Sequence, residues 1–143
     1  MRIKSVRAVV LFAAALALAA AAPTRAQEGH PLAGTWYGDY GSGTQKNDLT
    51  VIMKWDGTSV TGLINPGPNS RPLKSVVMNI TPGKPAAQGQ GSTSGIPPVF
   101  HVRIDVDGML FEGDIQNPVA GNRRITGTWT RGAEKGTFQL RRL

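Results

Sequence analysis

The sequence predicts an all-β protein whose strands form a single eight-stranded antiparallel up-and-down barrel. Residues 32–38 and 125–132 each carry a large aliphatic residue, a glycine and a tryptophan at alternate positions, so that a strand would place all three on one face. Glycine and proline recur along the chain, and no window of helical periodicity survives them. Turn signals instead separate eight strand-like stretches, at residues 34–40, 47–55, 59–65, 73–80, 98–106, 109–116, 124–130 and 136–141. Eight antiparallel strands can close into a barrel without an edge.

The first 26 residues are expected to be a signal peptide that is removed on export. Three basic residues within the first seven precede an alanine-rich apolar run at residues 8–22, which is the order found in Sec-type leaders. The run is shorter than the roughly 20 residues that a membrane-spanning helix needs, so no membrane anchor is expected. Small residues before position 27 favour cleavage after Ala26. The product would be a periplasmic or secreted barrel domain at residues 27–143.

Cysteine content and net charge limit how the domain can be stabilised and which partners are expected. The chain has no cysteine, so ordinary core burial, without disulfides, has to stabilise the domain. Four of the 16 basic residues lie in the leader and all 9 acidic residues lie beyond it, so the net charge falls from +7 to +3 on cleavage. The remaining basic residues are scattered, apart from a denser set at residues 123–124, 131, 135 and 141–142, which is interpreted as a solvated face. Nucleic acid is not an expected partner, because interleaved aromatic residues and a strong basic footprint are missing.

Turn signals also predict three hairpins. Folding the chain at Asp107-Gly108 puts apolar residues on one face and complementary polar pairs on the other, and a register wrong by one residue would mix these sets. The expected pairs are Val106–Met109, Ile104–Phe111, Val102–Gly113, Arg103–Glu112 and His101–Asp114. A turn at Asp56-Gly57 is expected to pair Met53–Val60, Val51–Gly62 and Leu49–Ile64. A hairpin through residues 131–136 is expected to bring together Trp129–Phe138 and Gly127–Leu140.

A long irregular loop is expected at residues 81–98. It is rich in Pro, Gly, Ser and Gln and exceeds the roughly 12–15 residues beyond which a structureless loop is unusual in a compact domain. Its composition favours disorder. The alternative is a lid over one mouth of the barrel.

The ends of the chain resemble the calycins, the group of barrels that includes the lipocalins and the avidins. The resemblance rests on Gly34-Thr35-Trp36 in the first strand, on the eight-strand meander and on an arginine in the last strand. In lipocalins an arginine from the end of the chain packs across the first-strand tryptophan and closes the base of the barrel. The resemblance therefore implies a barrel-closing pair, Trp36 with Arg141 or Arg142.

Two interpretations of the interior follow. In a lipocalin-like carrier, a small apolar ligand would occupy the lumen and contact Trp36, Trp55, Phe111 and Trp129. Many other apolar side chains are also predicted to point inward, and side chains can fill an eight-stranded barrel. The inward glycines at 34, 62, 113 and 127 would then permit bends rather than open space.

The expected function is binding or interaction rather than catalysis. Tyr37, Ile52, Leu63 and Val77 fall on the outer faces of successive strands, where they would form an apolar interaction patch. Such a patch would suit an unidentified protein partner or a weak homo-oligomer. Some secreted barrels of this kind are protease inhibitors, which is a further alternative.

No catalytic, cofactor-binding or metal site is expected, and the protein is not expected to be an enzyme. His30 precedes the first strand, and His101 is explained as the partner of Asp114. No serine lies in a nucleophile-elbow motif. His101 and Asp105 share a strand face, but four residues of strand separate them by about 13 Å, too far for one ion.

Overall fold

The chain forms one antiparallel sheet of nine strands. The computed structural model describes residues 29–85 and 95–143, and this part of the chain contains strands and turns but no helix. The strands are β1 (Gly34–Ser42), β2 (Gln45–Trp55), β3 (Val60–Ile64), β4 (Arg71–Pro72), β5 (Ser75–Thr81), β6 (Val99–Val106), β7 (Met109–Gln116), β8 (Arg124–Arg131) and β9 (Glu134–Arg142). Their hydrogen-bonded order is β4-β3-β2-β1-β9-β8-β7-β6-β5. The expected all-β class is confirmed, and the predicted leader lies outside the described residues.

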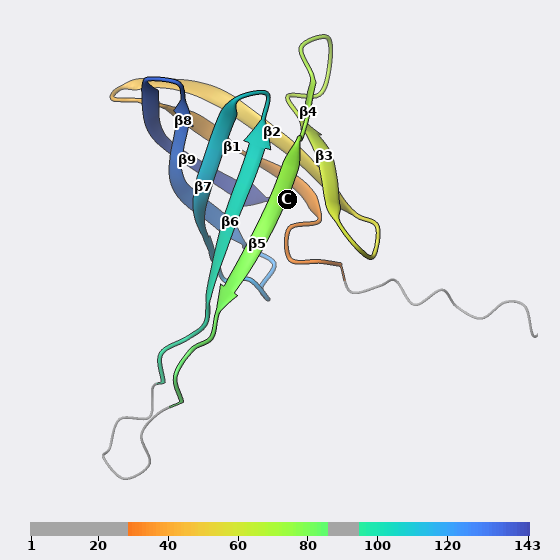
Figure 1. Cartoon of the computed structure of the whole chain (residues 1–143), viewed down its shortest axis with the longest axis vertical. Helices are drawn as coiled ribbons and strands as arrows, with labels where there is room; N and C mark the ends of the chain where they lie inside the picture. The colour runs from red at the N-terminus through yellow and green to blue at the C-terminus, as the bar shows by residue number, and fades with distance from the viewer. Residues whose placement is uncertain (1–28, 86–94) are drawn as a thin grey trace, which may run out of the picture.

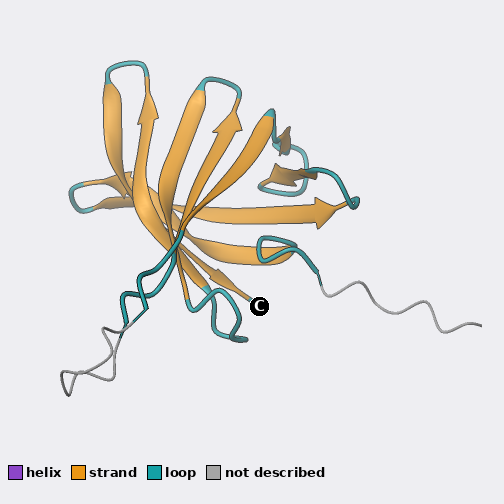
Figure 2. Cartoon of the chain, turned by 60° about the horizontal axis from the view of Figure 1, so that its bottom comes forward, coloured by secondary structure: helices purple, strands orange, loops and turns teal. Residues whose placement is uncertain are grey.

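The sheet curls into a half-barrel. Figure 1 shows β5, β6 and β7 lying in front of β1 and β2, with β3 beside β5, and Figure 2 shows the strands fanning around a shared interior. The two ends of the strand order are β4 and β5. β3 and β5 come close to one another, yet no strand pairing joins them in the described residues. We call this gap between β3 and β5 the seam; the expected closure into eight paired strands is not observed.

The seam arises because the short strand β3 pairs with β4 and not with β5. The proline-rich turn after β3 brings β4 back against it, with Leu63 opposite Pro72 and Ile64 opposite Arg71. The chain then crosses the seam at two consecutive residues, Leu73 and Lys74. The backbone N–H of Leu73 donates to the carbonyl of Gly62 at 2.9 Å, and that of Lys74 donates to the carbonyl of Asp105 at 2.8 Å. The edge of β3 is thereby occupied before β5 begins.

Apolar side chains fill the concave side of the sheet. Seventeen of them form one buried cluster, namely Leu32, Trp36, Leu49, Val51, Met53, Val60, Ile64, Val102, Ile104, Val106, Met109, Phe111, Ile115, Ile125, Trp129, Phe138 and Leu140. Gly113 and Gly127 face each other across β7 and β8, and a Cβ at either would collide with a carbonyl oxygen of the neighbouring strand. Glycine here permits the sharp curl of the sheet.

The hairpin at Asp107-Gly108 has the expected register, including Arg103 opposite Glu112 and His101 opposite Asp114. The other two registers are wrong by two residues. Trp55 pairs with Val60 and Met53 with Gly62, while Trp129 pairs with Gly136 and Gly127 with Phe138. An even shift keeps every side chain on its expected face.

Turn geometry explains the first of these shifts. The Asp56 carboxylate accepts hydrogen bonds from the backbone N–H groups of Thr58 and Ser59, both at 2.8 Å, and from the Ser59 hydroxyl at 3.0 Å. These bonds hold residues 56–59 as a loop that separates Trp55 from Val60. The Ser59 and then the Thr58 backbone bonds, followed by the Ser59 hydroxyl, lower the pKa of Asp56 below its ordinary value.

The connection between β5 and β6 projects away from the rest of the sheet (Figure 1). Lys84 and Ile96 form an isolated bridge with two backbone hydrogen bonds of 2.9 Å. Of the expected loop at residues 81–98, only residues 86–94 lie outside the described part, and the described part extends the β5–β6 hairpin.

The segment before β1 covers one end of the half-barrel. Ala33 donates its backbone N–H to the carbonyl of His30 at 2.8 Å, so residues 30–33 form a turn. Leu32 is fully buried, and its carbonyl accepts the indole N–H of Trp36 at 2.7 Å. In the described residues no helix has the length and apolar character that crossing a membrane requires.

Candidate binding surface at the seam

A hollow opens where β3 and β5 face each other without a strand pairing. Its volume is about 290 Å³, and it is lined by His30, Leu32, Trp55, Thr58, Ser59, Val60, Val76, Val77 and Met78. These residues come from the N-terminal turn, from the β2–β3 hairpin and from β5. The sequence brings them together only because β4 displaces β5 from β3.

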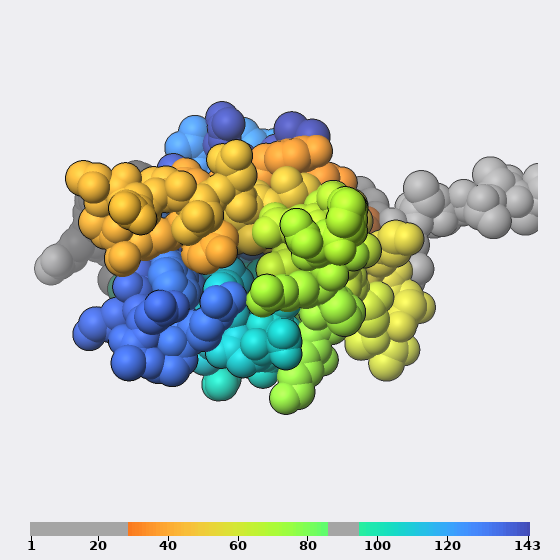
Figure 3. Space-filling model, turned by 90° about the horizontal axis from the view of Figure 1, so that it is seen from above, coloured from red at the N-terminus to blue at the C-terminus, as the bar shows by residue number. Residues whose placement is uncertain are grey.

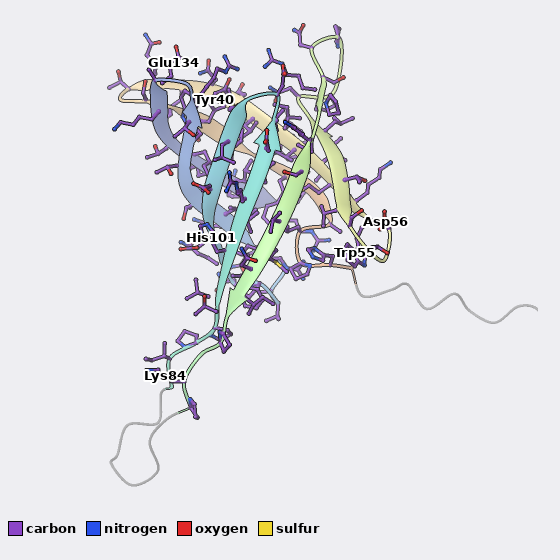
Figure 4. All side chains as sticks on the ribbon, viewed as in Figure 1. Tyr40, Trp55, Asp56, Lys84, His101 and Glu134 are labelled. Atoms are coloured by element: carbon purple, nitrogen blue, oxygen red, sulfur yellow. The ribbon has the colours of Figure 1, made fainter. Side chains whose placement is uncertain are left out.

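His30 and Trp55 form one wall of this hollow. Their rings stack with centroids 4.6 Å apart and planes inclined by 26°. The Nδ1 atom of His30 accepts the backbone N–H of Leu32 at 3.3 Å, which requires that nitrogen to be unprotonated. Desolvation lowers the pKa of His30 below its ordinary value of 6.5, so the ring is neutral at physiological pH. Figure 4 shows Trp55 and Asp56 at the β2–β3 turn, which lies at this end.

The outer edge of β5 has no strand partner in the described residues. Its seven residues, Ser75–Thr81, include no charged side chain. Val77 and Ile80 are 45% and 54% exposed, and Val99 and Ile96 are exposed on the facing part of the hairpin. Natural edge strands are usually protected from pairing by charges, prolines or bulges. β5 shows neither a charge nor a proline.

The four residues expected to contact a ligand in the lumen have different surroundings. Trp36, Phe111 and Trp129 are buried in the core. Phe111 packs edge-on against Phe138, with centroids 5.2 Å apart, and Trp129 packs edge-on against Tyr40 at 5.4 Å. Of the four, Trp55 lines the seam hollow.

Trp129 also borders a hollow of about 450 Å³ at the opposite end, between the β1–β2 and β8–β9 turns. Figure 3 looks onto this end, where the hairpin turns lie side by side. Polar and charged side chains such as Gln45, Glu134 and Lys135 line most of it. It is therefore a solvated space between turns rather than an entrance to an apolar lumen.

The expected interaction patch is divided. Ile52 and Leu63 lie directly opposite each other on β2 and β3, and both are partly buried. Tyr37 lies on β1, two residues after Thr35, which pairs with Ile52. Tyr37 is 42% exposed. Val77 lies across the seam on β5. The exposed apolar surface is concentrated on β5 and its hairpin rather than spread over the four strands.

The register distinguishes the two arginines expected to pair with Trp36. Arg142 lies opposite Trp36, whereas Arg141 lies opposite Tyr37 on the outer face. The Trp36 indole donates to the backbone carbonyl of Leu32. The guanidinium of Arg142 lies over Gly34, where a Cβ would be 2.7 Å from its Nε. The N-terminal turn, not an arginine alone, covers Trp36.

The remaining candidate groups form no chemical centre in the described residues. The Nδ1 atom of His101 lies 3.0 Å from a carboxylate oxygen of Asp114, on the outer surface of β6 and β7 (Figure 4). Groups of three or more His, Cys, Asp or Glu that could hold a metal ion do not occur in residues 29–85 and 95–143.

Sequence reasoning missed His30 and Tyr40. His30 precedes every strand-like stretch, so no periodicity marks it as part of a packed surface. Tyr40 lies on the inward face of β1 and packs edge-on against Phe111 at 5.8 Å. Tyr40 lies four residues after Trp36, so strand alternation puts both side chains on the same face, and this spacing could have identified it.

Comparisons of this chain with protein-family models, with curated proteins and with solved structures find no match.

Proposed function

We propose that this protein is an exported, non-enzymatic binding module that takes up an extended segment of a partner protein along the free edge of β5. Export follows from the expected leader and its cleavage after Ala26. Binding by strand addition uses backbone hydrogen bonds for affinity and side-chain contacts for specificity.

The unpaired edge of β5 is the observation that carries this proposal. A seven-residue strand without charges, next to exposed Val77 and Ile80, leaves backbone donors and acceptors for an incoming strand. Such a segment would obtain on β5 the pairing that β3 does not supply. It would also continue the sheet across the seam, the one place in the described part of the chain where the strand order is open, since the first and last strands, β1 and β9, are already paired.

The filled core favours a surface site over a ligand in the lumen. Trp36, Phe111 and Trp129 belong to one continuous cluster with apolar residues from β2, β3 and β6 to β9. The packed side chains of the protein already exclude water from this interior. A ligand there would have to displace packed side chains.

A second candidate function is the uptake of a small apolar molecule in the seam hollow. Trp55 contributes an aromatic surface there, beside Leu32, Val60 and Met78. This alternative retains the carrier function of the calycin resemblance but moves its site from the lumen to the side of the sheet.

A peptide selection tests the strand-addition proposal. Extended peptides are selected on the mature protein from a random display library, and their affinities are measured by fluorescence anisotropy. Val77→Lys/Ile80→Lys should abolish binding because it places two charges on the edge strand. Val119→Lys is the matched control, since Val119 is an exposed valine in the β7–β8 turn, and should leave binding unchanged.

Hydrogen exchange locates the bound segment. Peptide binding should slow the exchange of amides in β5 and not in β8. Equal affinities for the β5 variant and the Val119 control, or protection elsewhere on the sheet, would reject strand addition. Binding of a solvatochromic apolar dye that is lost in Trp55→Ala, together with a failure to select any peptide, would favour the small-molecule alternative. A mature protein that dimerises through β5, seen by light scattering, would identify a second copy as the partner.

A further inference from the structure

Four arginines gather at the end of the half-barrel where both the N-terminal turn and the C-terminal residues lie. Arg123 and Arg124 end the β7–β8 turn and begin β8, and Arg141 and Arg142 end β9. The antiparallel register places Arg124 directly opposite Arg141. Like charges in directly opposed positions destabilise a strand pair. An anion bound between Arg124 and Arg141 would offset this repulsion.

These arginines have no carboxylate partner in the described residues. The ion pairs within 4 Å join Lys46 to Asp39, His101 to Asp114 and Arg103 to Glu112, all outside the cluster. The Nε atom of Arg123 is buried without a hydrogen-bond partner. Desolvation, and secondarily the charge of Arg142, lower the pKa of Arg123 below its ordinary value. Positive charge is therefore crowded here without compensation.

The backbone holds these side chains in place. One terminal nitrogen of Arg123 donates to the carbonyl of Pro31 at 3.0 Å, and the backbone N–H of Arg142 donates to the carbonyl of Arg123 at 3.0 Å. Arg142 is further confined against Gly34. Arg124 and Arg141 lie on the paired strands β8 and β9. The cluster is built on the sheet and on a fixed turn rather than on a loose tail.

A hollow of about 240 Å³ is lined by all four arginines, together with Tyr37, Asn122 and Leu143. A second hollow, of about 260 Å³, lies on the other side of the ridge formed by Tyr37, Arg124 and Arg141. Asp39 lies in the second hollow and accepts a hydrogen bond from Gln139 at 2.7 Å, so its charge disfavours an anion there. The first hollow is lined by all four arginines and by no acidic side chain, whereas the second shares only Arg124 and Arg141 and includes Asp39, so the first is the better anion site.

We propose that the hollow among Arg123, Arg124, Arg141 and Arg142 binds a tetrahedral oxyanion, a phosphate or sulfate group carried by a larger molecule. Guanidinium groups donate paired hydrogen bonds to such oxygens, and several arginines together favour a doubly charged group over a single carboxylate. The exposed ring of Tyr37 at the rim offers apolar surface to the body of the ligand. The site is separate from the β5 edge, and its test does not depend on the function proposed above.

The experiment measures thermal stability and affinity with inorganic phosphate and with inorganic sulfate, against chloride at the same ionic strength, since general screening would act equally in all three. The mature protein should melt at a higher temperature in phosphate or sulfate than in chloride, because ligand binding to the folded state stabilises it. Arg124→Gln/Arg141→Gln should bind the anion at least about tenfold more weakly, given the usual strength of charged hydrogen bonds.

A matched control removes the same two charges from the other end of the same strands. Arg131→Gln/Lys135→Gln should retain the wild-type response to phosphate and sulfate. In chloride, Arg124→Gln/Arg141→Gln should melt no lower than the wild type, because it removes repulsion. Arginines with only a structural role would give the opposite result.

Vesicles identify the source of the anion. Phosphatidylcholine vesicles with phosphatidic acid present a lipid phosphate, and pure phosphatidylcholine vesicles are their control. Arginine-dependent binding of the acidic vesicles, with or without a response to free anions, supports the site and assigns it to a lipid phosphate. A response to free anions alone assigns it to a soluble ligand. Equal responses of both double variants, or no response to phosphate, sulfate or acidic vesicles, would overturn the proposal.

Discussion

The imidazole of His30 stacks on the indole of Trp55 at a centroid separation of 4.6 Å, so a residue before the first strand forms part of the seam. Its Nδ1 accepts the N–H of Leu32, and Leu32 in turn accepts the N–H of Trp36. This series of contacts connects the seam to the fully buried tryptophan in the first strand.

Stability should fall when the pH is lowered through the range in which His30 titrates. Desolvation lowers its pKa in the folded state from the ordinary 6.5, so between the two values the unfolded chain binds more protons. The contribution of neutral His30 is present above pH 6.5 and is lost as the pH falls toward the folded pKa. Urea titrations at a series of pH values above pH 5 would measure this slope.

Two variants isolate the role of His30. His30→Phe preserves an aromatic ring against Trp55 but cannot be protonated, and it should flatten the slope. His101→Gln removes the other histidine, so comparing the two variants separates the contribution of His30 from that of His101. An unchanged slope in His30→Phe would assign the pH dependence to other groups.

Core and surface residues of the β6–β7 hairpin should differ in their effect on stability. Ile104→Ala or Phe111→Ala should lower the free energy of unfolding by roughly 2–5 kcal/mol, as truncations of buried side chains do. Arg103→Ala should cost at most about 1 kcal/mol, since the Arg103–Glu112 pair is exposed and 3.8 Å long. Denaturant titration measures all three, and a larger loss for Arg103→Ala would mean that the inner and outer faces are exchanged.

Trp36 should be far less tolerant of substitution than Trp55. Trp36→Ala removes a fully buried ring and should cost roughly 3–5 kcal/mol. Trp55 is only partly buried, and Trp55→Ala should cost less. Thermal melting compares the two variants, and the fluorescence of the Trp36 indole should be blue-shifted relative to an exposed tryptophan. Equal shifts in melting temperature would refute the central position of Trp36.

The exported product should begin at Gln27. The charged start and apolar run of the leader predict cleavage after Ala26. Intact-mass analysis of the periplasmic or culture fraction would show the mass of residues 27–143. A product that still begins at Met1 in the cytoplasm would contradict both the cleavage and the export.

Alternation of apolar and polar residues was sufficient to predict the faces of the strands but not every register. Asp107-Gly108 is a two-residue turn, so the pairing of Ile104 with Phe111 followed directly. The side-chain hydrogen bonds of Asp56 enlarge its loop, which moves Met53 from Val60 to Gly62. A shift of two residues leaves the pattern of faces intact, so the pattern could not reveal it.

The seam and its contacts depend on interactions that no local pattern records. The return of Arg71 and Pro72 onto β3 adds a strand too short to give a periodic signal. The stacking of His30 on Trp55 joins residues from a turn and a strand end. The cluster of arginines was visible as a set of sequence positions, but only the register shows Arg124 opposite Arg141.

The two sides of the seam are joined by backbone hydrogen bonds at one place only in the described residues. At Leu73 and Lys74 the two sides are joined by backbone hydrogen bonds to Gly62 and Asp105. Farther along, Trp55 and Met78 line the hollow, and no strand pairing joins β3 to β5 in the described residues. Backbone pairing is therefore continuous from β4 to β5 around the sheet, and the seam is bridged by backbone hydrogen bonds at Leu73 and Lys74. Widening the hollow beside Trp55 would break no strand pairing, because β3 and β5 are not paired in the described residues.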